Sequence, residues 1–188
     1  MEKPYSSGTR AVITGGPGVG KTSICDELRR KGYTVIPEAA RQLVDKIERG
    51  ESQAPPPWED PQVFNSHLLP FMQELYHDEH PTDGSDVIMD RHVIDIAAYT
   101  GFYDGSTPQG FEELRRRFHP DVAFIPEPLP DYNTDTVRKE SEEKAKALHA
   151  SIQSAYEFYG VNTVTVPYYD APKEDSIKRR SLFIERRM

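Results

Sequence analysis

Short runs of apolar residues alternate along the chain with segments in which apolar side chains recur every three or four positions. The runs, rich in β-branched residues, predict buried strands, and the longer spacing predicts helices with one apolar face. We expect strands at residues 10–14, 33–36, 87–89, 122–125 and 161–166. We expect helices over residues 21–31, 38–49, 93–103 and 135–159, another from residue 63 onwards, and a closing helix within 173–188.

This alternation of strands and helices predicts the fold class. Strands that alternate with helices form parallel sheets covered on both faces. We therefore expect an α/β protein of three layers, in which a five-stranded, mostly parallel sheet is flanked by helices. In the closing helix, we expect an apolar side to pack on the core (Ile177, Leu182, Phe183 and Ile184) and the charged residues to form a solvated face.

Two stretches interrupt the alternation. Residues 50–62 contain Pro55-Pro56-Pro57-Trp58, which fits neither a regular helix nor a central strand because proline donates no backbone N–H. We interpret this stretch as a surface flap. Residues 126–133 are also loop-like. Both are interpreted as candidate moving parts of a single domain spanning residues 1–188, not as linkers between domains.

Composition places the chain among soluble proteins. It has 188 residues, of which 36% are hydrophobic and 29% charged, enough for one domain with a sizeable core and a hydrated surface. No stretch reaches the roughly 20 apolar residues that span a bilayer, and the polar N-terminus lacks an apolar leader. The single cysteine, Cys25, has no internal disulfide partner. We expect a cytoplasmic protein without a transmembrane segment.

The net charge of −8 argues against broad binding to DNA or to anionic membranes, because polyanions attract clustered Lys and Arg. The charge is unevenly distributed, however. Residues 1–30 carry five bases and three acids, for +2, whereas residues 37–90 carry three bases and twelve acids, for −9. The acidity therefore lies mostly outside the N-terminal segment, and it does not argue against binding of a single phosphorylated ligand there.

The N-terminal segment contains a phosphate-binding motif. Gly15-x-x-x-x-Gly20-Lys21-Thr22 stands between a predicted strand and a predicted helix, the context that the phosphate loop of nucleotide-binding proteins requires. The glycines let successive backbone N–H groups point at phosphate oxygens, and the helix start adds its positive end. Lys21 is expected at the β- and γ-phosphates, the Thr22 hydroxyl at Mg²⁺ and Ser23 at the α-phosphate. The expected nucleotide-binding residues are Gly15, Gly16, Pro17, Gly18, Val19, Gly20, Lys21, Thr22 and Ser23.

Other candidate residues follow the second and third strands. Asp90 ends an apolar run, as the magnesium-binding carboxylate of these proteins does, and could accept a hydrogen bond from a magnesium water or from Thr22. Ligands in open parallel sheets lie beyond the carboxyl ends of the strands. Glu38 would therefore face the same crevice as Lys21, where it could orient and deprotonate an acceptor hydroxyl. Alternatively, Glu38 only complements a helix dipole.

The acceptor site has further candidates. We place Arg41, Arg91 and Tyr99 there, although Arg41 fits a surface role equally well. Tyr99 could stack on a ring-shaped substrate together with Trp58, Phe64 and Tyr103, but aromatic residues at helical spacing are more often core packing. His77-x-x-His80 is interpreted as a solvated turn, because matching metal ligands are lacking elsewhere. Arg115-Arg116-Arg117 is interpreted as part of a surface helix.

These segments together resemble a known family. The residues that carry the resemblance are Gly15 to Ser23, Pro37-Glu38-Ala39-Ala40-Arg41, Asp90-Arg91 with Asp95-Ile-Ala-Ala-Tyr99, and Asp135 with Arg138. They are similar to the small P-loop NTPase and kinase family labelled AAA-type ATPase-like, which is related to nicotinamide riboside kinases of the NadR type. The resemblance covers roughly residues 10–170. It implies a P-loop NTPase fold, Glu38 and Asp90-Arg91 as site residues, and a lid over about 127–145 in which Arg138 is catalytic.

We therefore predict an ATP- or GTP-dependent phosphotransferase that uses Mg²⁺ and acts on a small hydroxyl-bearing metabolite, with a nucleoside as one candidate. Lys21, Glu38, Asp90 and Arg138 are the predicted catalytic residues, with Thr22 and Asp90 at the metal. The alternative is a regulatory nucleotide-binding NTPase that a protein or phosphoinositide partner recognises. The sequence lacks the Asn-Lys-x-Asp motif of Ras-like switches, and it leaves the oligomeric state open.

Overall fold

The computed structural model describes residues 8–102, 105–130 and 142–188. Its strands are β1 (Arg10–Ile13), β2 (Thr34–Ile36), β3 (Val87–Asp90), β4 (Val122–Pro126) and β5 (Asn162–Val166). The helices of the described residues are α1 (Lys21–Arg30), α2 (Ala39–Glu48), α3 (Pro61–Glu79), α4 (Val93–Phe102), α5 (Phe111–Arg117), α6 (Glu142–Phe158) and α7 (Lys173–Glu185). These bounds agree with most of the elements predicted from the apolar pattern, but α5 was indicated only as a surface helix at residues 115–117, and the predicted start of the helix at residue 135 lies outside the described residues.

The five strands form one sheet in the order β2-β3-β1-β4-β5, and every neighbouring pair is parallel. The register places Ile13 of β1 beside Asp90 of β3 and Phe124 of β4. The predicted fold class is confirmed, and the sheet is entirely parallel.

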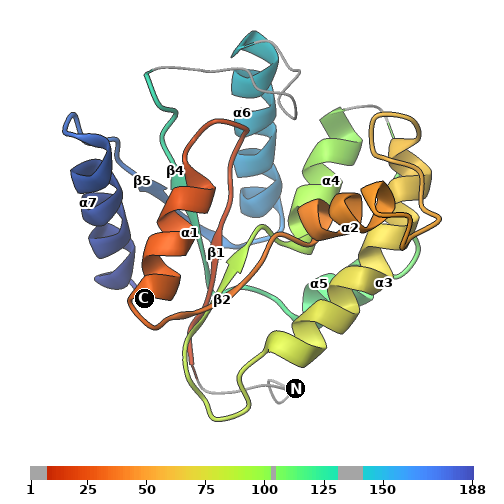
Figure 1. The fold of residues 1–188 in the computed structure, drawn as a ribbon, viewed down its shortest axis with the longest axis horizontal. Helices are drawn as coiled ribbons and strands as arrows, with labels where there is room; N and C mark the ends of the chain where they lie inside the picture. The colour runs from red at the N-terminus through yellow and green to blue at the C-terminus, as the bar shows by residue number, and fades with distance from the viewer. Residues whose placement is uncertain (1–7, 103–104, 131–141) are drawn as a thin grey trace.

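Alternate side chains of the central strand face the two helical layers. Ala11 and Ile13 pack with residues of α1 and α7, whereas Val12 packs with residues of α2 to α6. Figure 1 shows the same arrangement, with α1 and α7 on one side of the sheet and α3, α4 and α6 on the other. This sandwich is the physical reason for the unbroken apolar runs of the strands, which are buried on both faces.

The strand order determines where a ligand can bind. β1 lies between β3 and β4, and the chain leaves β1 for α1 on one face of the sheet and leaves β3 for α4 on the other. The carboxyl ends of β1, β2 and β3 meet at one edge, at the point where the direction of winding reverses. Open α/β sheets bind their ligands at such a point.

The flap is shorter than the sequence indicated. Residues 61 and 62 belong to α3, which begins at Pro61 and is capped by the Asp60 carboxylate, an acceptor for the N–H groups of Gln62 and Val63. Asp60 before Pro61 is a favourable helix start, because proline tolerates the first position. Pro70 stays inside this helix. Among the flap residues, Ala54 is buried and Trp58 is exposed, so Trp58 is not a packing residue in the core.

The closing helix differs from its predicted pattern. Leu182 is exposed, although we expected it on the core, and the buried positions of α7 are Ser176, Arg180, Ser181 and Ile184. An arginine of the predicted solvated face therefore enters the interior. His80 is likewise buried against Phe118, not solvated as predicted, while its neighbour His77 is exposed. The described residues contain no cluster of three or more metal-binding side chains.

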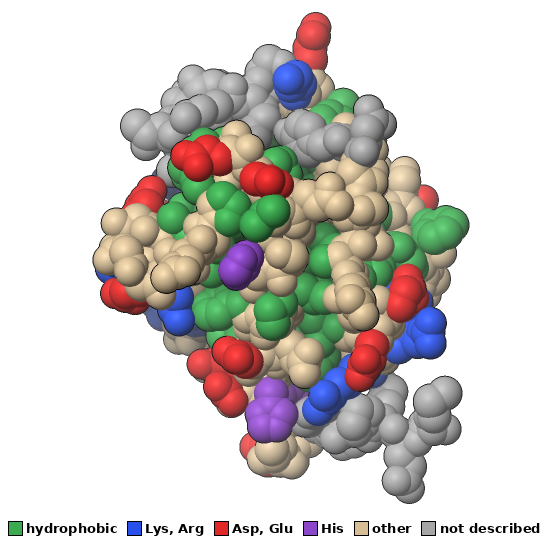
Figure 2. Space-filling model, turned by 90° about the vertical axis from the view of Figure 1, so that its right-hand side faces the viewer, with side chains coloured by type: hydrophobic (Ala, Val, Ile, Leu, Met, Phe, Trp, Pro, Cys, Tyr) green, Lys and Arg blue, Asp and Glu red, His purple; other side chains and the backbone are tan. Residues whose placement is uncertain are grey.

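The surface accords with the acidic composition. Figure 2 shows acidic side chains dispersed among hydrophobic ones over the face that carries α3. On α5, Arg116 is exposed and pairs with the Glu112 carboxylate, whereas Arg115 pairs with the same carboxylate but is largely covered and lies over the Tyr159 ring. Within the described ranges, no helix combines the length and the apolar character needed to cross a bilayer.

Candidate functional site

The predicted phosphate loop connects β1 to α1. Gly15, Gly18 and Gly20 have φ angles of 127°, 80° and 83°, a region that favours glycine over residues with a side chain. Gly20 is the N-cap of α1, and the first intrahelical bond is donated by Ile24 to its carbonyl. The N–H groups of the first turn therefore lack intrahelical acceptors and can bind an anion, which the positive end of the helix also attracts.

Lys21 lies over this loop and is only 8% exposed. Its Nζ donates hydrogen bonds to the carbonyl oxygens of Gly15 and Gly16, at 2.9 and 2.7 Å. Burial, followed by the positive charge of Arg91, lowers the pKa of the Lys21 ammonium to about 7, against the opposing effect of three nearby carboxylates. The loop thus holds its own cation where the phosphates of a nucleotide are expected.

His149 of α6 contacts the outer side of the same loop. The N–H of Gly16 donates a hydrogen bond to His149 Nδ1 at 3.1 Å. The Gly15 carbonyl, which belongs to the same peptide group, accepts a hydrogen bond from Lys21. Burial and the neighbouring Lys21 lower the pKa of His149, which favours the neutral ring that can accept this bond. Sequence reasoning missed His149, since a single histidine on an amphipathic helix carries no motif.

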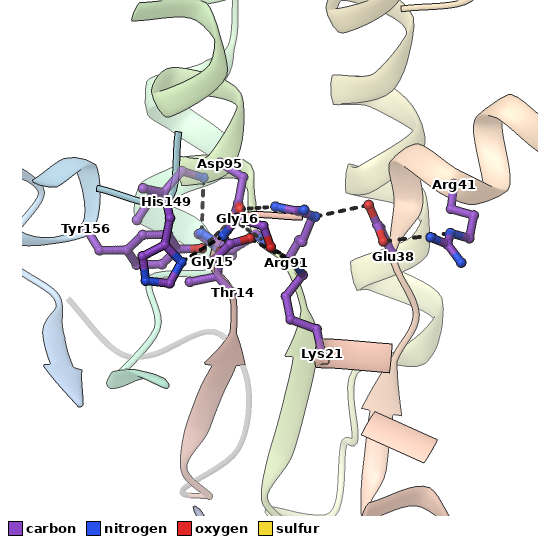
Figure 3. A network of polar contacts seen from close by, with 12 residues as sticks. Thr14, Gly15, Gly16, Lys21, Glu38, Arg41, Arg91, Asp95, His149 and Tyr156 are labelled. Atoms are coloured by element: carbon purple, nitrogen blue, oxygen red, sulfur yellow. Dashed lines mark hydrogen bonds and ion pairs between the residues drawn. The ribbon is translucent and has the colours of Figure 1, made fainter. Parts of the chain in front are cut away.

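A second set of charges centres on Arg91 (Figure 3). Its Nε donates to Glu38 Oε1 at 3.0 Å, and its Nη1 donates to Asp95 Oδ1 at 2.9 Å. The guanidinium also lies over the Tyr99 ring, 5.5 Å from its centroid. Arg91 has a φ of 68°, an uncommon value for a residue with a side chain, so its direction is imposed by these contacts and not by local preference.

Asp95 anchors this arrangement from the interior. Its buried carboxylate accepts hydrogen bonds from Thr14 Oγ1 at 2.6 Å, from Tyr156 Oη at 2.6 Å and from the N–H of His92 at 3.0 Å, besides the bond from Arg91. These donors belong to the end of β1, to α6 and to the start of α4. Asp95 entered the sequence reasoning only as part of a family segment, and its role as a hub was not predicted.

The predicted metal-binding residues lie beside the loop. Asp90 is buried, and its Oδ1 has no hydrogen-bond partner among the described residues. Burial, together with the charge of Glu38, raises the pKa of this carboxyl group. A buried carboxylate oxygen without a hydrogen-bond partner fits Mg²⁺, which usually keeps several waters and uses one or two protein carboxylates. The Thr22 side chain is exposed at the start of α1, where it can reach such an ion.

The remaining predicted residues are placed as follows. Arg41 is largely exposed, with its Nε 3.9 Å from Glu38 Oε2. Glu38, Arg91 and Tyr99 do come together, as predicted, and Glu38 and Asp90 both interact electrostatically with Lys21. Arg138 lies outside the described residues, as does most of the predicted lid. A small cleft at the outer side of the loop is lined by Pro17, Gly18, Val19, Pro128, Leu129, Glu142, Ala145, Lys146 and His149.

Comparison with known proteins agrees with this picture. A family model described as an AAA domain matches residues 10–174. No curated protein sequence matches the chain. The structure is similar to that of NadR in complex with NR, with a TM-score of 0.61 and 15% identity over 95% of this chain and 49% of NadR. The chain thus spans about half of NadR.

Thymidylate kinases have the same fold over their whole length. The enzyme from Ehrlichia chaffeensis has a TM-score of 0.53 and 16% identity, covering 97% of this chain and 98% of its own. The enzyme from Candida albicans has a TM-score of 0.50 and 12% identity over 96% of this chain and 90% of its own. At these identities the likeness concerns the fold, which is that of P-loop kinases.

Proposed function

Because the chain belongs to the AAA domain family, whose model covers residues 10–174, we propose that it is a P-loop phosphotransferase that moves the γ-phosphoryl group of ATP or GTP to a small hydroxyl-bearing metabolite. The observation that carries the proposal is the Glu38 carboxylate, which Arg91 holds in the same charged cluster as Lys21. A site that only binds a nucleotide does not require a second oriented carboxylate there. Nucleosides are the first acceptors to test, since NadR is described with NR and, in another complex, with AMP-PNP.

The proposed reaction uses the site residues in distinct roles. The acceptor oxygen attacks the γ-phosphorus, the bond from that phosphorus to the β–γ bridging oxygen breaks, and the nucleoside diphosphate leaves. Glu38 accepts the hydroxyl proton. We assign this proton to Oε2, because Oε1 already accepts a hydrogen bond from Arg91 and Oε2 lies 3.9 Å from Arg41, beyond hydrogen-bond distance. Catalysis then consists mainly of positioning and charge compensation.

The nucleotide would be held by the phosphate loop. Its N–H groups and Lys21 would bind the β- and γ-phosphates, with Lys21 exchanging the carbonyls of Gly15 and Gly16 for phosphate oxygens. Mg²⁺, bound near Thr22 and Asp90, would offset the charge of the same phosphates. We also propose that Arg138 acts from the lid and that the protein functions in the cytoplasm.

A screen for phosphorylated products tests the proposal. ATP or GTP with Mg²⁺ is incubated with nucleosides and small alcohols, and products are detected by mass spectrometry. We expect one acceptor class to be phosphorylated. We expect Glu38→Gln to lower kcat by about 10²- to 10⁴-fold, the usual contribution of a general base, while nucleotide affinity stays within a few-fold.

Glu48→Gln is the matched control, because Glu48 is an exposed glutamate at the far end of the same helix, α2. It should leave transfer unchanged. Nucleotide hydrolysis without any phosphorylated product, equal in wild type and Glu38→Gln, would contradict the proposed transferase and favour a regulatory NTPase.

A further inference from the structure

A buried arginine from α7 contacts the phosphate loop from outside. Arg180 is 2% exposed, although it belongs to a helix whose other basic side chains are on the surface. Its Nη1 donates to the Val19 carbonyl at 2.9 Å, and its Nη2 donates to the Glu127 carbonyl at 2.7 Å. One guanidinium thus ties the phosphate loop to the chain that leaves β4. No motif in the sequence indicates this connection.

The contact with Val19 fixes the orientation of one peptide group. A trans peptide is planar, so the Val19 carbonyl and the Gly20 N–H point in opposite directions. Because Arg180 binds the Val19 carbonyl, the Gly20 N–H points away from the Arg180 guanidinium and is left for another acceptor. A Cβ on Gly20 would lie 3.3 Å from Arg180 Nη1, which shows how closely the arginine approaches the loop.

The charge of Arg180 is incompletely compensated. None of the carboxylates in the described ranges forms an ion pair with it, and its Nε has no hydrogen-bond partner there. The Glu127 carboxylate is near enough to interact electrostatically, but its Oε2 accepts the Tyr168 N–H at 2.8 Å. Two carbonyl oxygens therefore supply the hydrogen bonds to this buried cation. A buried charge is unfavourable unless other charges or dipoles compensate it, and a polyphosphate in the loop would do so.

We propose that Arg180 is a positioning residue of the phosphate site, which orients the Val19–Gly20 peptide toward a bound polyphosphate and places a buried positive charge behind the loop. The inference rests on the proposed nucleotide-binding function and adds a residue of the C-terminal helix to it. Arg180 acts through the loop and does not touch the ligand.

Binding of ADP and of inorganic pyrophosphate, each with Mg²⁺, tests the inference by calorimetry. We expect Arg180→Met to weaken both ligands at least tenfold, and by a similar factor. Arg180→Lys, which keeps the charge but loses the fork that reaches two carbonyls, should weaken both to an intermediate extent. An equal loss of affinity for the two ligands identifies a role at the phosphates. If Arg180 helped to recognise the base, the substitution would weaken ADP binding and leave pyrophosphate binding unchanged.

Arg179→Met is the matched control. It removes the same charge from the neighbouring position of α7, where the exposed side chain lies over the Tyr169 ring, 5.9 Å from its centroid. It should bind both ligands as wild type does. Circular dichroism checks that each variant is folded. If Arg180→Met does not fold, the affinities of Arg180→Lys for the two ligands are the test of the inference.

Affinities of a folded Arg180 variant for both ligands within twofold of wild type would overturn the inference. This binding measurement uses no acceptor substrate, so its result does not depend on whether the protein transfers a phosphoryl group. A wild-type protein that binds neither ligand would overturn this inference and the proposed function together.

Discussion

Lys21 is held by the backbone of its own loop, and this has a consequence for pH. The ammonium donates to two carbonyls while burial lowers its pKa to about 7. The charged form is the one that binds phosphate. Since phosphate oxygens raise the pKa of a bound lysine, binding above pH 7 must include uptake of a proton.

We therefore predict that the affinity for Mg·ADP falls by up to about tenfold for each pH unit above 7, the slope for uptake of one proton. Calorimetry between pH 7 and 9, in buffers of different ionisation enthalpy, measures both the affinity and the proton uptake. Lys21→Arg is the control, because arginine stays charged throughout this range and should give a flat profile even if it binds more weakly. A wild-type profile as flat as that of Lys21→Arg would contradict the prediction.

At the scale of residues, the sequence identified those candidate site residues that belong to a local sequence pattern. Gly15 to Ser23 form one contiguous motif, and Glu38 and Asp90 each follow an apolar strand, so local pattern was sufficient. His149 and Arg180 could not be found in this way. Each contacts the loop from more than 100 residues away in the chain, and only the packing of α6 and α7 brings them there.

At the scale of elements, the phosphate loop and α6 are packed so closely that there is no room for a side chain between them. A Cβ on Gly16 would lie 2.9 Å from the Ala145 carbonyl oxygen and 3.0 Å from His149 Cβ. The φ of Gly16 is not among the positive values found in this loop, so close approach, not backbone conformation, requires glycine at this position. α6 begins within the last residues of the predicted lid, about 127–145, and its His149 contacts the phosphate loop directly.

We predict that Gly16→Ala forces α6 away from the loop and lowers the free energy of unfolding by about 1–3 kcal/mol, the usual effect of overpacking. Chemical denaturation measures it. Gly101→Ala in α4 is the control, since a Cβ there meets nothing within 4 Å and should stabilise the helix by about 0.5–1 kcal/mol. Equal unfolding free energies for the two variants would show that the contact between the loop and α6 is not tight.

The elements themselves were largely predictable, and the exceptions have a common cause. Strands buried on both faces leave an unambiguous apolar run, as in Val87 to Met89. Helices on the outer layers leave no such unambiguous pattern, because the rotation of each helix about its axis depends on the elements that it packs against. In α7, packing against α1 buries Arg180 and Ser181 and leaves Leu182 exposed, a rotation that the apolar pattern alone did not reveal.

At the scale of the whole molecule, the phosphate loop connects to both helical layers. α1 continues from it, α6 contacts it through His149, and α7 contacts it through Arg180. A nucleotide bound to the loop should therefore stabilise the described fold as a unit. Stabilisation by a ligand that binds only the folded state is about 2.7 kcal/mol at 100 times its Kd.

We predict that Mg·ADP at this concentration raises Tm by about 5–10 °C, from the usual relation between free energy and Tm for a chain of this size. Differential scanning calorimetry measures the shift. Lys21→Ala should show little of it at the same ligand concentration, since it lacks the cation over the loop. A shift of equal size in Lys21→Ala would exclude the loop as the binding site.

The position of β1 in the middle of the sheet also governs when the site can form during synthesis. The ribosome makes β1 and the phosphate loop before the strands on either side of β1, which end at residues 90 and 126, and His149 and Arg180 follow later still. A nascent chain therefore carries the motif long before it has the surroundings that shape it. The phosphate motif is therefore made before the residues that complete its site, and we expect a bound nucleotide to stabilise the fold fully only once residue 180 has been made.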